Sequence, residues 1–322
     1  MVKIRFGVIG CGYIAKKAFI PALKKSCYAE LVAVTSRDKN IAKSFSIEFG
    51  CNYEMDYETL LNRDDIDAVY IATVPSTHEE LILMSAKYGK HILCEKPLTT
   101  SYNSAKKIVS YCKNSDVGIF EGFMYQFHSQ HQKVRDFVRD GQIGKPILFT
   151  ASFGFPPLED DNYRYTYELG GGACLDAGSY TIHAARHFFQ REPIDIHSTI
   201  YKNGMEVDIH GASLLDFGDS QTAQLSFGFN NYYRNTYSIW GTKGQITVER
   251  AFSVPAALQP KIIVEKQDYY EEIECDPEDQ FVKEIEYFCK GLISESIVNA
   301  WQNDALTQAK LIDIIKNQNK RK

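Results

Sequence analysis

The first residues whose types and spacing could do chemistry form a glycine-rich turn near the amino end. Residues 10–15 read Gly-Cys-Gly-Tyr-Ile-Ala, the pattern G-x-G-x-x-A. Its first glycine permits a tight turn, its second lets a pyrophosphate approach the backbone, and its small third residue lets helix and strand pack closely. The helix that follows offers free N–H groups and a positive dipole. The turn predicts dinucleotide binding, with Gly10, Gly12, Tyr13 and Ile14 beside the ligand.

A second group bears on which dinucleotide binds. An NAD site uses a carboxylate to bind the ribose 2′-OH, whereas an NADP site uses an arginine for the 2′-phosphate. Ser36 and Arg37 end an apolar run and place a hydroxyl beside a guanidinium, which suits a phosphate. Asp38 competes for this role, but it comes one residue later and could cap the next helix. We therefore expect NADP (NADPH) rather than NAD.

A lysine stands where a catalytic residue is expected. Glu95, Lys96 and Pro97 follow a predicted strand over residues 91–94. In a doubly wound sheet the carboxyl ends of the strands face the ligand crevice, so Lys96 would point toward a nicotinamide. A Lys-Pro bond can also be cis, in a tight turn that would aim the lysine. The alternative is a surface Glu-Lys pair in front of a helix.

Three further polar residues share one face of a predicted helix over residues 174–189. Asp176, Tyr180 and His183 are spaced i, i+4 and i+7. Tyr180 could act as a general acid, or it could be a buried aromatic side chain of an amphipathic helix. His183 and His187 could be read as metal ligands, but no carboxylate or cysteine spacing completes a set, and we expect no metal.

Two loops add aromatic and cationic side chains. Tyr163 and Arg164 precede the triple glycine at residues 170–172, which would let the chain pack closely beneath a cofactor. Tyr233 and Arg234 follow the end of a predicted strand. An aromatic ring and a guanidinium suit stacking on a nucleotide base and clamping a diphosphate, and they suit a hairpin tip at an interface equally well.

The elements that must position these residues alternate in the first part of the chain. Apolar runs predict five strands, and amphipathic runs between them predict helices. The strands cover residues 3–9, 30–35, 67–72, 91–94 and 117–120, and the helices cover 14–25, 39–49, 57–61, 77–88 and 99–114. Strands that alternate with helices indicate βαβ units and a parallel, doubly wound Rossmann sheet. We place this NAD(P)-binding domain at residues 1–122.

The order of predicted elements changes in the remainder of the chain, residues 123–322. After a helix over 129–139, most of the chain consists of strand-like runs, and only the helix over 174–189 interrupts them. The runs are 146–155, 206–217, 221–229, 235–240, 244–249 and 261–266. Consecutive strands with hairpin signals indicate an open, mainly antiparallel sheet in an α/β domain. We expect it to bind substrate and to form a homodimer or homotetramer. Two closing helices, 277–291 and 302–317, are candidates to pack back on the first domain.

Length and composition limit the number of domains, the kinds of partner and the cellular setting that we expect. A chain of 322 residues is about two domains of roughly 150 residues each. A net charge of −5 argues against nucleic acid or a membrane surface as a partner, since both need a basic face. No run approaches the roughly 18 apolar residues of a membrane helix. The eight cysteines are scattered without a C-x-x-C pair, which is typical of a reducing, cytoplasmic setting.

Four segments give the sequence a family resemblance. They are GVIGCGYIA at 7–15, GKHILCEKPLTT at 89–100, EGFMYQFHSQHQKVRDFV at 121–138 and ELGGGACLDAGSYTIHAARHF at 168–188. With these motifs the chain resembles the Gfo/Idh/MocA family of oxidoreductases over nearly its whole length. The resemblance implies that Lys96 hydrogen-bonds the substrate oxygen, that Asp176 is the Asp of the D-x-G motif, and that Thr73, Pro75, His78, Glu95 and Arg164 lie near the cofactor. His78 could instead simply begin a helix, and Arg164 could be a surface charge at a cleft rim.

The resemblance also narrows the activity. Many polyol dehydrogenases of the family have His at the position of Tyr180, so an inositol-dehydrogenase-like activity is less favoured. A tyrosine there resembles nucleotide-sugar 3-ketoreductases, dihydrodiol dehydrogenases and some aldose oxidoreductases. We expect reduction of a nucleotide-linked keto-sugar, with Tyr180 as general acid and Lys96 stabilising the oxyanion. A free-aldose or trans-dihydrodiol dehydrogenase and a non-catalytic NADP sensor are the alternatives, and His183, Tyr163, Tyr233 and Arg234 are candidate substrate contacts.

Overall fold

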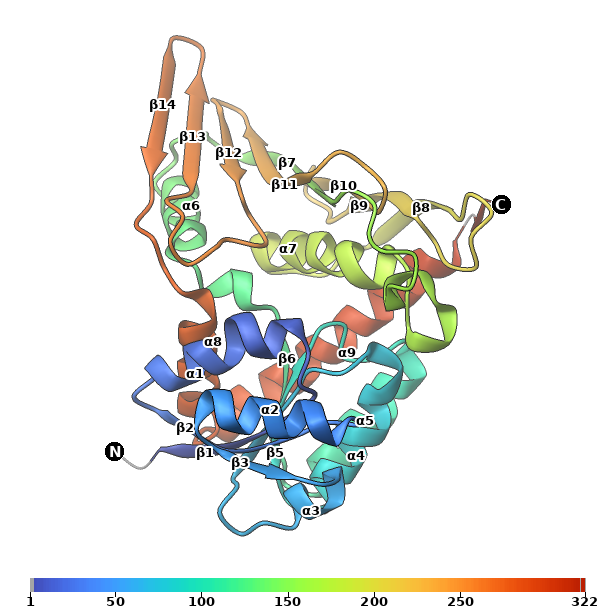
Figure 1. The fold of residues 1–322 in the computed structure, drawn as a ribbon. Coiled ribbons are helices and arrows are strands. Elements are labelled where there is room, and N and C mark those ends of the chain that lie inside the picture. Colours follow the sequence, from blue (N-terminus) through green and yellow to red (C-terminus); the bar gives the residue numbers. More distant parts are fainter. Residues whose placement is uncertain (1–2, 319, 322) are drawn as a thin grey trace. The chain divides into compact units, whose positions relative to one another are not determined.

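The computed structural model describes residues 3–318 and 320–321 of the chain (Figure 1). It divides into two compact units. Unit 1 takes in the chain up to Met124 together with Phe281–Lys310, and unit 2 takes in Tyr125–Gln280 together with the chain from Leu311 onward. The domain boundary expected at residue 122 stays a prediction. The segment Phe281–Lys310 of unit 1 contains most of the two closing helices.

Unit 1 is built on a six-stranded parallel sheet in the order β3-β2-β1-β4-β5-β6. The middle strands are continuous buried runs, as a sheet covered on both faces requires. The order reverses direction between β1 and β4, which is the switch point of a doubly wound fold. The strands are β1 (Ile4–Ile9), β2 (Ala29–Thr35), β3 (Asn52–Glu54), β4 (Ala68–Ile71), β5 (His91–Glu95) and β6 (Ile119–Gly122).

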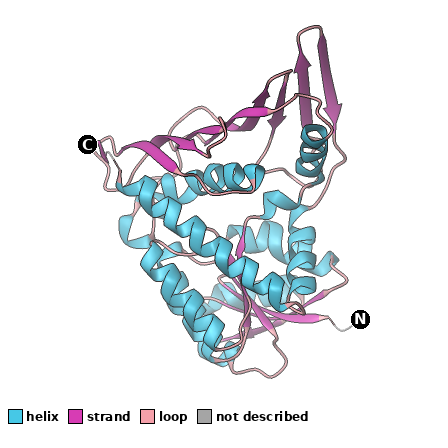
Figure 2. Cartoon of the chain, turned by 180° about the vertical axis from the view of Figure 1, so that it is seen from behind, coloured by secondary structure: helices cyan, strands magenta, loops and turns pink. Residues whose placement is uncertain are grey.

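Helices cover both faces of this sheet (Figure 2). On one face α4, α5 and part of α9 pack on the strands. On the other, Phe19 stacks on Tyr70, with ring centroids 3.4 Å apart, and Phe6 meets Phe288 of α8. The helices are a π-helical turn (Ala15–Phe19) continued by α1 (Ile20–Lys25), α2 (Lys39–Phe49), α3 (Tyr57–Leu61), α4 (His78–Lys87), α5 (Tyr102–Asn114), α8 (Gln280–Gly291) and α9 (Glu295–Asn317), with 3-10 turns at Pro75–Thr77 and Met124–Phe127.

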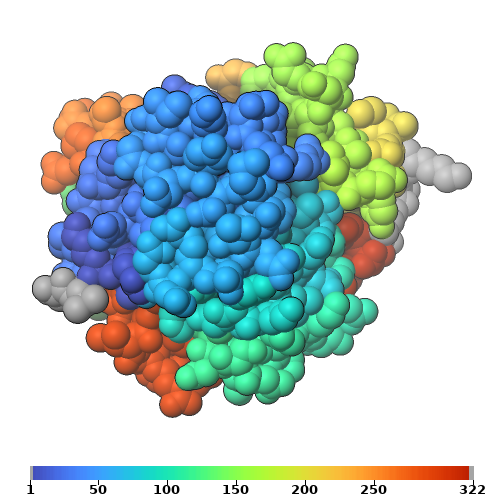
Figure 3. Space-filling model, turned by 60° about the horizontal axis from the view of Figure 1, so that its bottom comes forward, coloured from blue at the N-terminus to red at the C-terminus, as the bar shows by residue number. Residues whose placement is uncertain are grey.

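The C-terminal segment of unit 1 is part of its surface and of its core. In the space-filling view its orange-red surface lies beside that of residues near 100–120, in teal to green (Figure 3). A methyl group at Gly118 would lie 2.8 Å from Leu292 Cδ2, and Gln302 Nε2 donates to the Val117 carbonyl at 3.4 Å. Residues far apart in sequence therefore complete this unit.

Unit 2 is a nine-stranded mixed sheet in the order β14-β13-β12-β11-β7-β10-β9-β8-β15. β7 pairs with β10, and β8 with β15, in parallel, and the other neighbours are antiparallel. The strands are β7 (Pro146–Gly154), β8 (Asp195–Tyr201), β9 (His210–Asp216), β10 (Thr222–Gly228), β11 (Arg234–Gly241), β12 (Gln245–Glu249), β13 (Lys261–Lys266), β14 (Tyr269–Glu274) and β15 (Lys320–Arg321).

One face of this sheet is covered by helices and the other is not. α7 (Ser179–Phe189) packs on β7 and β10, and α6 (Ser129–Arg139) packs on β11 through His131. Before α7 come 3-10 turns at Tyr163–Tyr165 and Tyr167–Leu169 and a π-helical turn at Cys174–Gly178. The open face exposes large apolar side chains, with Leu214 43% and Trp240 55% exposed. Assembly through this face stays a prediction.

The predicted fold class is confirmed: a Rossmann unit and a unit with a mainly antiparallel sheet. Four strands were not predicted, the shortest of which is β15, with two residues. β3 has only three residues, β14 has no buried face, and β8 carries Ser198 on its buried side, which interrupts the apolar alternation. Within the described part of the chain, no helix is long and apolar enough to cross a membrane.

Candidate active site

The glycine turn at the carboxyl end of β1 has two glycines with different roles. Gly10 has φ +102°, and a Cβ there would lie 2.7 Å from the Ala72 carbonyl oxygen, so the fold itself requires glycine. At Gly12 a Cβ would meet only that same oxygen, at 3.8 Å, and φ is not positive. Nothing in the described chain needs glycine at position 12. The missing side chain leaves a cradle beside the backbone, which suits close approach of a pyrophosphate.

The neighbours of this turn are consistent with a nucleotide site. Tyr13 is exposed, at 80%, in the first turn of the helix, and Ile14 is half-buried. Burial raises the pKa of Cys11 to about 12, so its thiol stays protonated at neutral pH. The cysteine in the G-x-G pattern therefore adds no charge.

The end of β2 separates the two candidates for cofactor choice. Asp38 caps α2: its Oδ1 accepts from the N–H groups of Asn40 at 2.8 Å and Ile41 at 3.4 Å. Ser36 is half-buried and Arg37 is exposed just before the cap. The carboxylate is thus engaged in the helix terminus, while hydroxyl and guanidinium stand at the strand end, as the sequence predicted.

The lysine segment lies at the carboxyl end of β5 and is held by buried side chains. The Lys96–Pro97 peptide bond is cis. The Tyr70 hydroxyl donates to Glu95 at 2.5 Å, and the Leu98 N–H donates to Glu121 Oε1 at 2.8 Å. Strands β4 and β6 on either side of β5 therefore fix the residues that flank Lys96.

The segment after β4 meets the lysine turn through His78. Thr77 donates its hydroxyl to that of Thr73 at 2.7 Å, and Pro75 opens the 3-10 turn. His78 is fully buried, and its two ring nitrogens lie against the Pro97 and Thr73 carbonyl oxygens. Its ring is engaged by the backbone, and its contact with a cofactor stays a prediction.

In unit 2 the structure brings Arg164 and Asp176 together. Arg164 Nε donates to Asp176 Oδ2 at 2.6 Å. Burial works to lower the pKa of Arg164, but the charges of Asp176, Tyr163 and Tyr180 raise it above its ordinary value. The guanidinium also lies over the Tyr163 ring, 4.7 Å from its centroid. Arg164 is therefore a fixed cation beside the two residues predicted to do chemistry in this unit.

Glycines 171 and 172 let the chain pack this tightly. A Cβ at Gly171 would lie 2.5 Å from the Arg164 carbonyl oxygen, and one at Gly172 would lie 2.5 Å from Asp208 Oδ1. Asp208, which is 6% exposed, accepts from the Cys174 N–H at 2.6 Å and so holds the start of the π-helical turn that carries Asp176. Burial raises the pKa of Asp208. Sequence reasoning missed this carboxylate, whose partners are 34 residues away.

Tyr180 lies in an aromatic pocket on α7, 6% exposed. Its ring centroid is 5.2 Å from that of Phe153 and 5.9 Å from those of Tyr125 and Phe252. The Tyr125 hydroxyl lies 2.6 Å from His183 Nδ1, so His183 is bonded to a neighbour of Tyr180. Tyr125 was not singled out from the sequence, although it stands in one of the four family segments.

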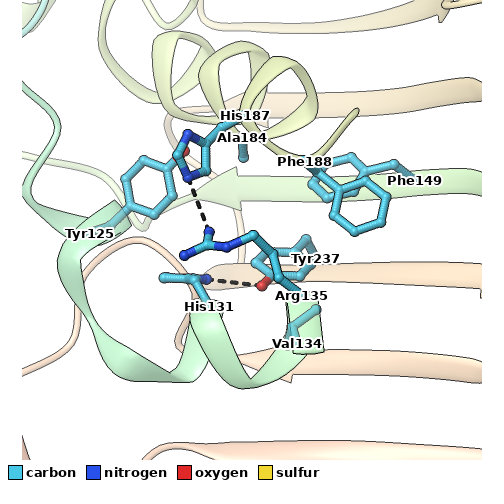
Figure 4. Close-up of a pocket in the computed structure, with 9 residues that line it drawn as sticks. All are labelled: Tyr125, His131, Val134, Arg135, Phe149, Ala184, His187, Phe188 and Tyr237. Carbon is cyan, nitrogen blue, oxygen red and sulfur yellow. Dashed lines mark hydrogen bonds between the residues drawn. The ribbon is translucent and has the colours of Figure 1, made fainter. Parts of the chain in front are cut away.

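Behind this pocket a small cavity separates α7 from α6 (Figure 4). Its volume of about 20 Å³ is enough for one water molecule. Arg135 Nη1 lies 3.1 Å from His187 Nε2, and His131 Nδ1 lies 2.9 Å from the Tyr237 hydroxyl. Burial, followed by the charges of His128, His187 and Arg135, lowers the pKa of His131 well below its ordinary value. Among the described residues no set of three His, Cys, Asp or Glu side chains could hold a metal ion.

The remaining candidates lie at the carboxyl end of β10 and the start of β11. Asn235 Nδ2 donates to the Tyr233 hydroxyl at 3.0 Å, and the Arg250 guanidinium lies 4.8 Å from the Tyr233 ring centroid. Arg234 is exposed. The Tyr165 hydroxyl donates to Asn230 Oδ1 at 2.6 Å, which ties this turn to the Arg164 loop. The structure thus gathers the two aromatic loops of unit 2.

Comparison with known proteins assigns this architecture to a class. Residues 4–123 match a family model described as "Oxidoreductase family, NAD-binding Rossmann fold", and residues 131–247 match one described as "GFO/IDH/MocA C-terminal domain". The chain therefore belongs to the Gfo/Idh/MocA family of oxidoreductases, as the sequence motifs predicted.

Particular relatives are similar over nearly the whole chain. A dTDP-3,4-didehydro-2,6-dideoxy-alpha-D-glucose 3-reductase of Saccharopolyspora spinosa is 36% identical over 97% of this chain and 96% of its own. A D-xylose 1-dehydrogenase (NADP(+)) of Haloferax volcanii is 28% identical over 96% and 95%. A 3-ketoreductase from Actinomadura kijaniata, solved with NADP and TDP-benzene, has a TM-score of 0.93 and 36% identity over 99% and 98% of the two chains. Variants of it with one lysine or one tyrosine replaced are also known.

Proposed function

We propose that this protein is an NADP-dependent oxidoreductase that reduces a carbonyl group of a nucleotide-linked keto-sugar. The observation that carries the proposal is the similarity to dTDP-sugar 3-reductases, which extends through both units at 36% identity. Of the four segments that suggested a sugar ketoreductase, 7–15 and 89–100 lie in the first matched region and 168–188 lies in the second, while 121–138 runs from the one to the other. Eight free cysteines accord with the cytoplasmic location that we also propose.

The residues around the glycine turn fit NADP. The cradle at Gly12 leaves room for a pyrophosphate, and the exposed Arg37 stands where a 2′-phosphate needs a cation. When bound as NADPH, the cofactor supplies the hydride. The residues proposed to hold it are Gly10, Gly12, Tyr13, Ile14, Ser36, Arg37, Thr73, Pro75, His78, Glu95, Lys96 and Arg164.

Two residues are proposed to manage charge at the reacting oxygen. Tyr180 gives its proton to the developing alkoxide as general acid, and Lys96 stabilises that oxyanion as a cation. Asp176 orients the cation of Arg164, and it is also a candidate to orient Lys96 or to accept a sugar hydroxyl. The lysine and tyrosine replaced in the Actinomadura enzyme are separated by as many positions as Lys96 and Tyr180, which supports the pairing.

The substrate contacts are proposed on chemical grounds. Tyr163 and Tyr233 each carry an arginine over one ring face, and a partly exposed ring of this kind can stack on a base. Arg234 offers a guanidinium to a diphosphate. His183 is 3% exposed and hydrogen-bonded to Tyr125. We therefore propose that it acts by holding the aromatic pocket around Tyr180.

The test follows NADPH oxidation by absorbance across dTDP- and UDP-linked keto-hexoses and free sugars, with NADH as the control cofactor. We expect turnover on a nucleotide-linked keto-sugar with NADPH. Lys96→Met and Tyr180→Phe should each lower kcat by at least about 100-fold while the Kd for NADPH stays within about threefold. Lys107→Met removes a surface lysine paired with Glu79 and should change neither. Unchanged turnover in the Lys96 variant would overturn the assignment.

A second candidate function is supported by the D-xylose dehydrogenase relative. It is the oxidation of a free aldose, or of a dihydrodiol, by the same residues run in reverse. Turnover with NADP and free sugars or diols alone would establish it. Tight NADPH binding without turnover on any member of a panel that includes all three substrate classes would favour the third candidate, a non-catalytic NADP sensor.

A further inference from the structure

A buried histidine joins the two loops that flank the proposed hydride-transfer site. His78 is the first residue of α4 and is 0% exposed. Its Nδ1 lies 3.0 Å from the carbonyl oxygen of Pro97, the residue after Lys96. Its Nε2 lies 3.2 Å from the carbonyl oxygen of Thr73, two residues before the 3-10 turn. One ring thus spans the lysine turn and the loop proposed to hold the cofactor.

We propose that His78 is a positioning residue that sets Lys96 relative to the cofactor loop through these two carbonyl groups. The proposal rests on the proposed function, since it assigns Lys96 and the loop at Thr73 to hydride transfer. Other side chains also hold the lysine turn, because Glu121 accepts from Leu98 and Tyr70 donates to Glu95. The contacts of His78, in contrast, reach both the lysine turn and the loop at Thr73.

The hydrogen-bond chemistry makes the two contacts inequivalent. Both partners are carbonyl oxygens, which only accept, and a neutral imidazole carries a single N–H. A neutral His78 therefore donates to one loop and turns a lone pair toward the other, and only the imidazolium holds both. Burial lowers the pKa of His78, the carbonyls of Thr73 and Pro97 raise it again, and the charge of Lys96 lowers it. A neutral ring would hold only one loop, so the proposal requires the imidazolium, which donates to both carbonyl groups.

The geometry explains why such a residue affects rate. Pro97 is covalently next to Lys96, so a shift of the Pro97 peptide group moves the lysine. Displacement of a reacting group by about 1 Å can cost about a hundredfold in rate. A shift of the loop at Thr73 instead moves groups proposed to bind the cofactor. Loss of the Nδ1 contact should therefore lower kcat, and loss of the Nε2 contact should weaken cofactor binding.

Two amide variants separate these effects. The amide nitrogen of an asparagine falls near the Nδ1 position of a histidine, and that of a glutamine falls near Nε2. His78→Asn keeps a donor for Pro97, so we expect kcat within about threefold of wild type and a Kd for NADPH raised about 10-fold. His78→Gln keeps a donor for Thr73, so we expect the Kd within about threefold and kcat lowered about 10- to 100-fold.

A matched control lies at the start of β5, the strand that Lys96 follows. His91, the first residue of β5, is half-buried, and its Nδ1 accepts from the Gly118 N–H at 3.0 Å. His91→Asn and His91→Gln should lower the melting temperature and leave kcat and Kd unchanged. If the two His78 variants lose kcat and Kd in equal proportion, or lose only stability as the His91 variants do, the proposal is wrong.

A measurement without substitution covers the case in which a His78 variant fails to fold. Long-range ¹H–¹⁵N spectra of histidine-labelled wild type, bound to NADPH, report which ring nitrogens carry protons. The proposal expects protons on both ring nitrogens of His78, because each carbonyl group needs a donor, and a ring protonated at one nitrogen alone would overturn it. The Kd and the spectra need no substrate. A wild type that reduces no keto-sugar would therefore count against the proposed function, while these two readouts still decide the role of His78.

Discussion

Asp38 and Arg37 are adjacent residues with separate duties. The Asp38 carboxylate accepts hydrogen bonds from two N–H groups at the start of α2, so capping this helix is a sufficient reason for an aspartate at this position. The Arg37 side chain is exposed, and none of the contacts described above gives it a role in stabilising the fold. A charge-assisted hydrogen bond to a phosphate contributes about 1.5–3 kcal/mol, which is roughly 10- to 100-fold in affinity. The two side chains can therefore be tested against each other.

We predict that Arg37→Ala raises the Kd for NADPH about 10- to 100-fold and that for NADH less than about threefold, because only NADPH has the 2′-phosphate. Asp38→Ala should lower the free energy of unfolding by about 1 kcal/mol through the lost cap and leave the NADPH to NADH ratio unchanged. Fluorescence titration and urea denaturation measure both. Equal weakening of the two cofactors by Arg37→Ala would mean that another group sets the choice.

The Asp38 cap shows which site features a sequence can predict. Its partners are two and three residues away, so local pattern was sufficient. The pairing of Arg164 with Asp176 depends on a loop that folds back over the triple glycine, and the Asp176 spacing gave no sign of it. The carbonyl partners of His78 are 5 and 19 residues away and carry no side-chain signal. Sequence could name these residues but not their partners.

At the scale of elements, the same distinction holds for strands. The strands of the parallel sheet were predicted where they are continuous apolar runs, as in β4, whose four residues are all buried. In β8 the inward Ser198 is satisfied by the Ile315 carbonyl and by Gln318, from the far end of the chain. Because these hydrogen-bond partners are more than 100 residues away, the local sequence pattern does not indicate that a buried serine is tolerated in this strand. The helix expected over 174–189 begins as a π-helical turn, whose first residue, Cys174, donates its N–H to Asp208.

The triple glycine is the element that brings the Arg164 loop and the start of α7 into contact. The Gly171 N–H donates to the Thr166 carbonyl and the Gly172 N–H to the Arg164 carbonyl, both at 3.0 Å. A methyl group at Gly171 would lie 2.5 Å from the Arg164 carbonyl oxygen and 2.8 Å from the Thr166 carbonyl oxygen, which is too close. Backbone cannot yield as a flexible side chain does, so the loop itself must move away.

We predict that Gly171→Ala breaks the Arg164–Asp176 pair, lowers the free energy of unfolding by about 1–3 kcal/mol, and lowers kcat at least about 10-fold. Gly211→Ala is the control, since its methyl group would meet the Phe227 and Ile200 side chains in the core of the sheet at 2.7 Å. It should lose similar stability and keep its kcat. Urea denaturation and steady-state kinetics distinguish the two variants, and an equal loss of kcat in both would refute the role given to the glycine.

At the scale of the whole molecule, the C-terminal helix α8 places an acid in the core of unit 1. Glu284 is 1% exposed, and no donor among the described residues reaches its Oε1. Burial, and then the charge of Glu95, raises the pKa of Glu284 well above its ordinary value. The folded protein therefore holds this proton to a higher pH than the unfolded chain does. This carboxyl group links global stability to pH.

The sign of the linkage follows from the proton count. Above the ordinary pKa of a glutamic acid the native state binds more protons than the unfolded state, so the free energy of unfolding falls as pH rises. Glu284→Gln removes this dependence. We predict that it raises the free energy of unfolding by about 1–3 kcal/mol at pH 8, with the gain shrinking toward pH 4.5, because near that pH both states hold the proton.

Glu79 provides a control of opposite sign. Its hydrogen bond to Lys107 lowers its pKa, so its contribution to stability is present above the ordinary pKa and is lost on acidification. Glu79→Gln should therefore lower the free energy of unfolding at pH 8, by less than about 1 kcal/mol because the pair is solvent-screened. Urea denaturation followed by tryptophan fluorescence from pH 4.5 to 8 measures both variants. A Glu284→Gln protein that is less stable than wild type at pH 8 would show that the buried carboxyl group is ionised and compensated in the fold, because an amide would then have removed a favourable charge.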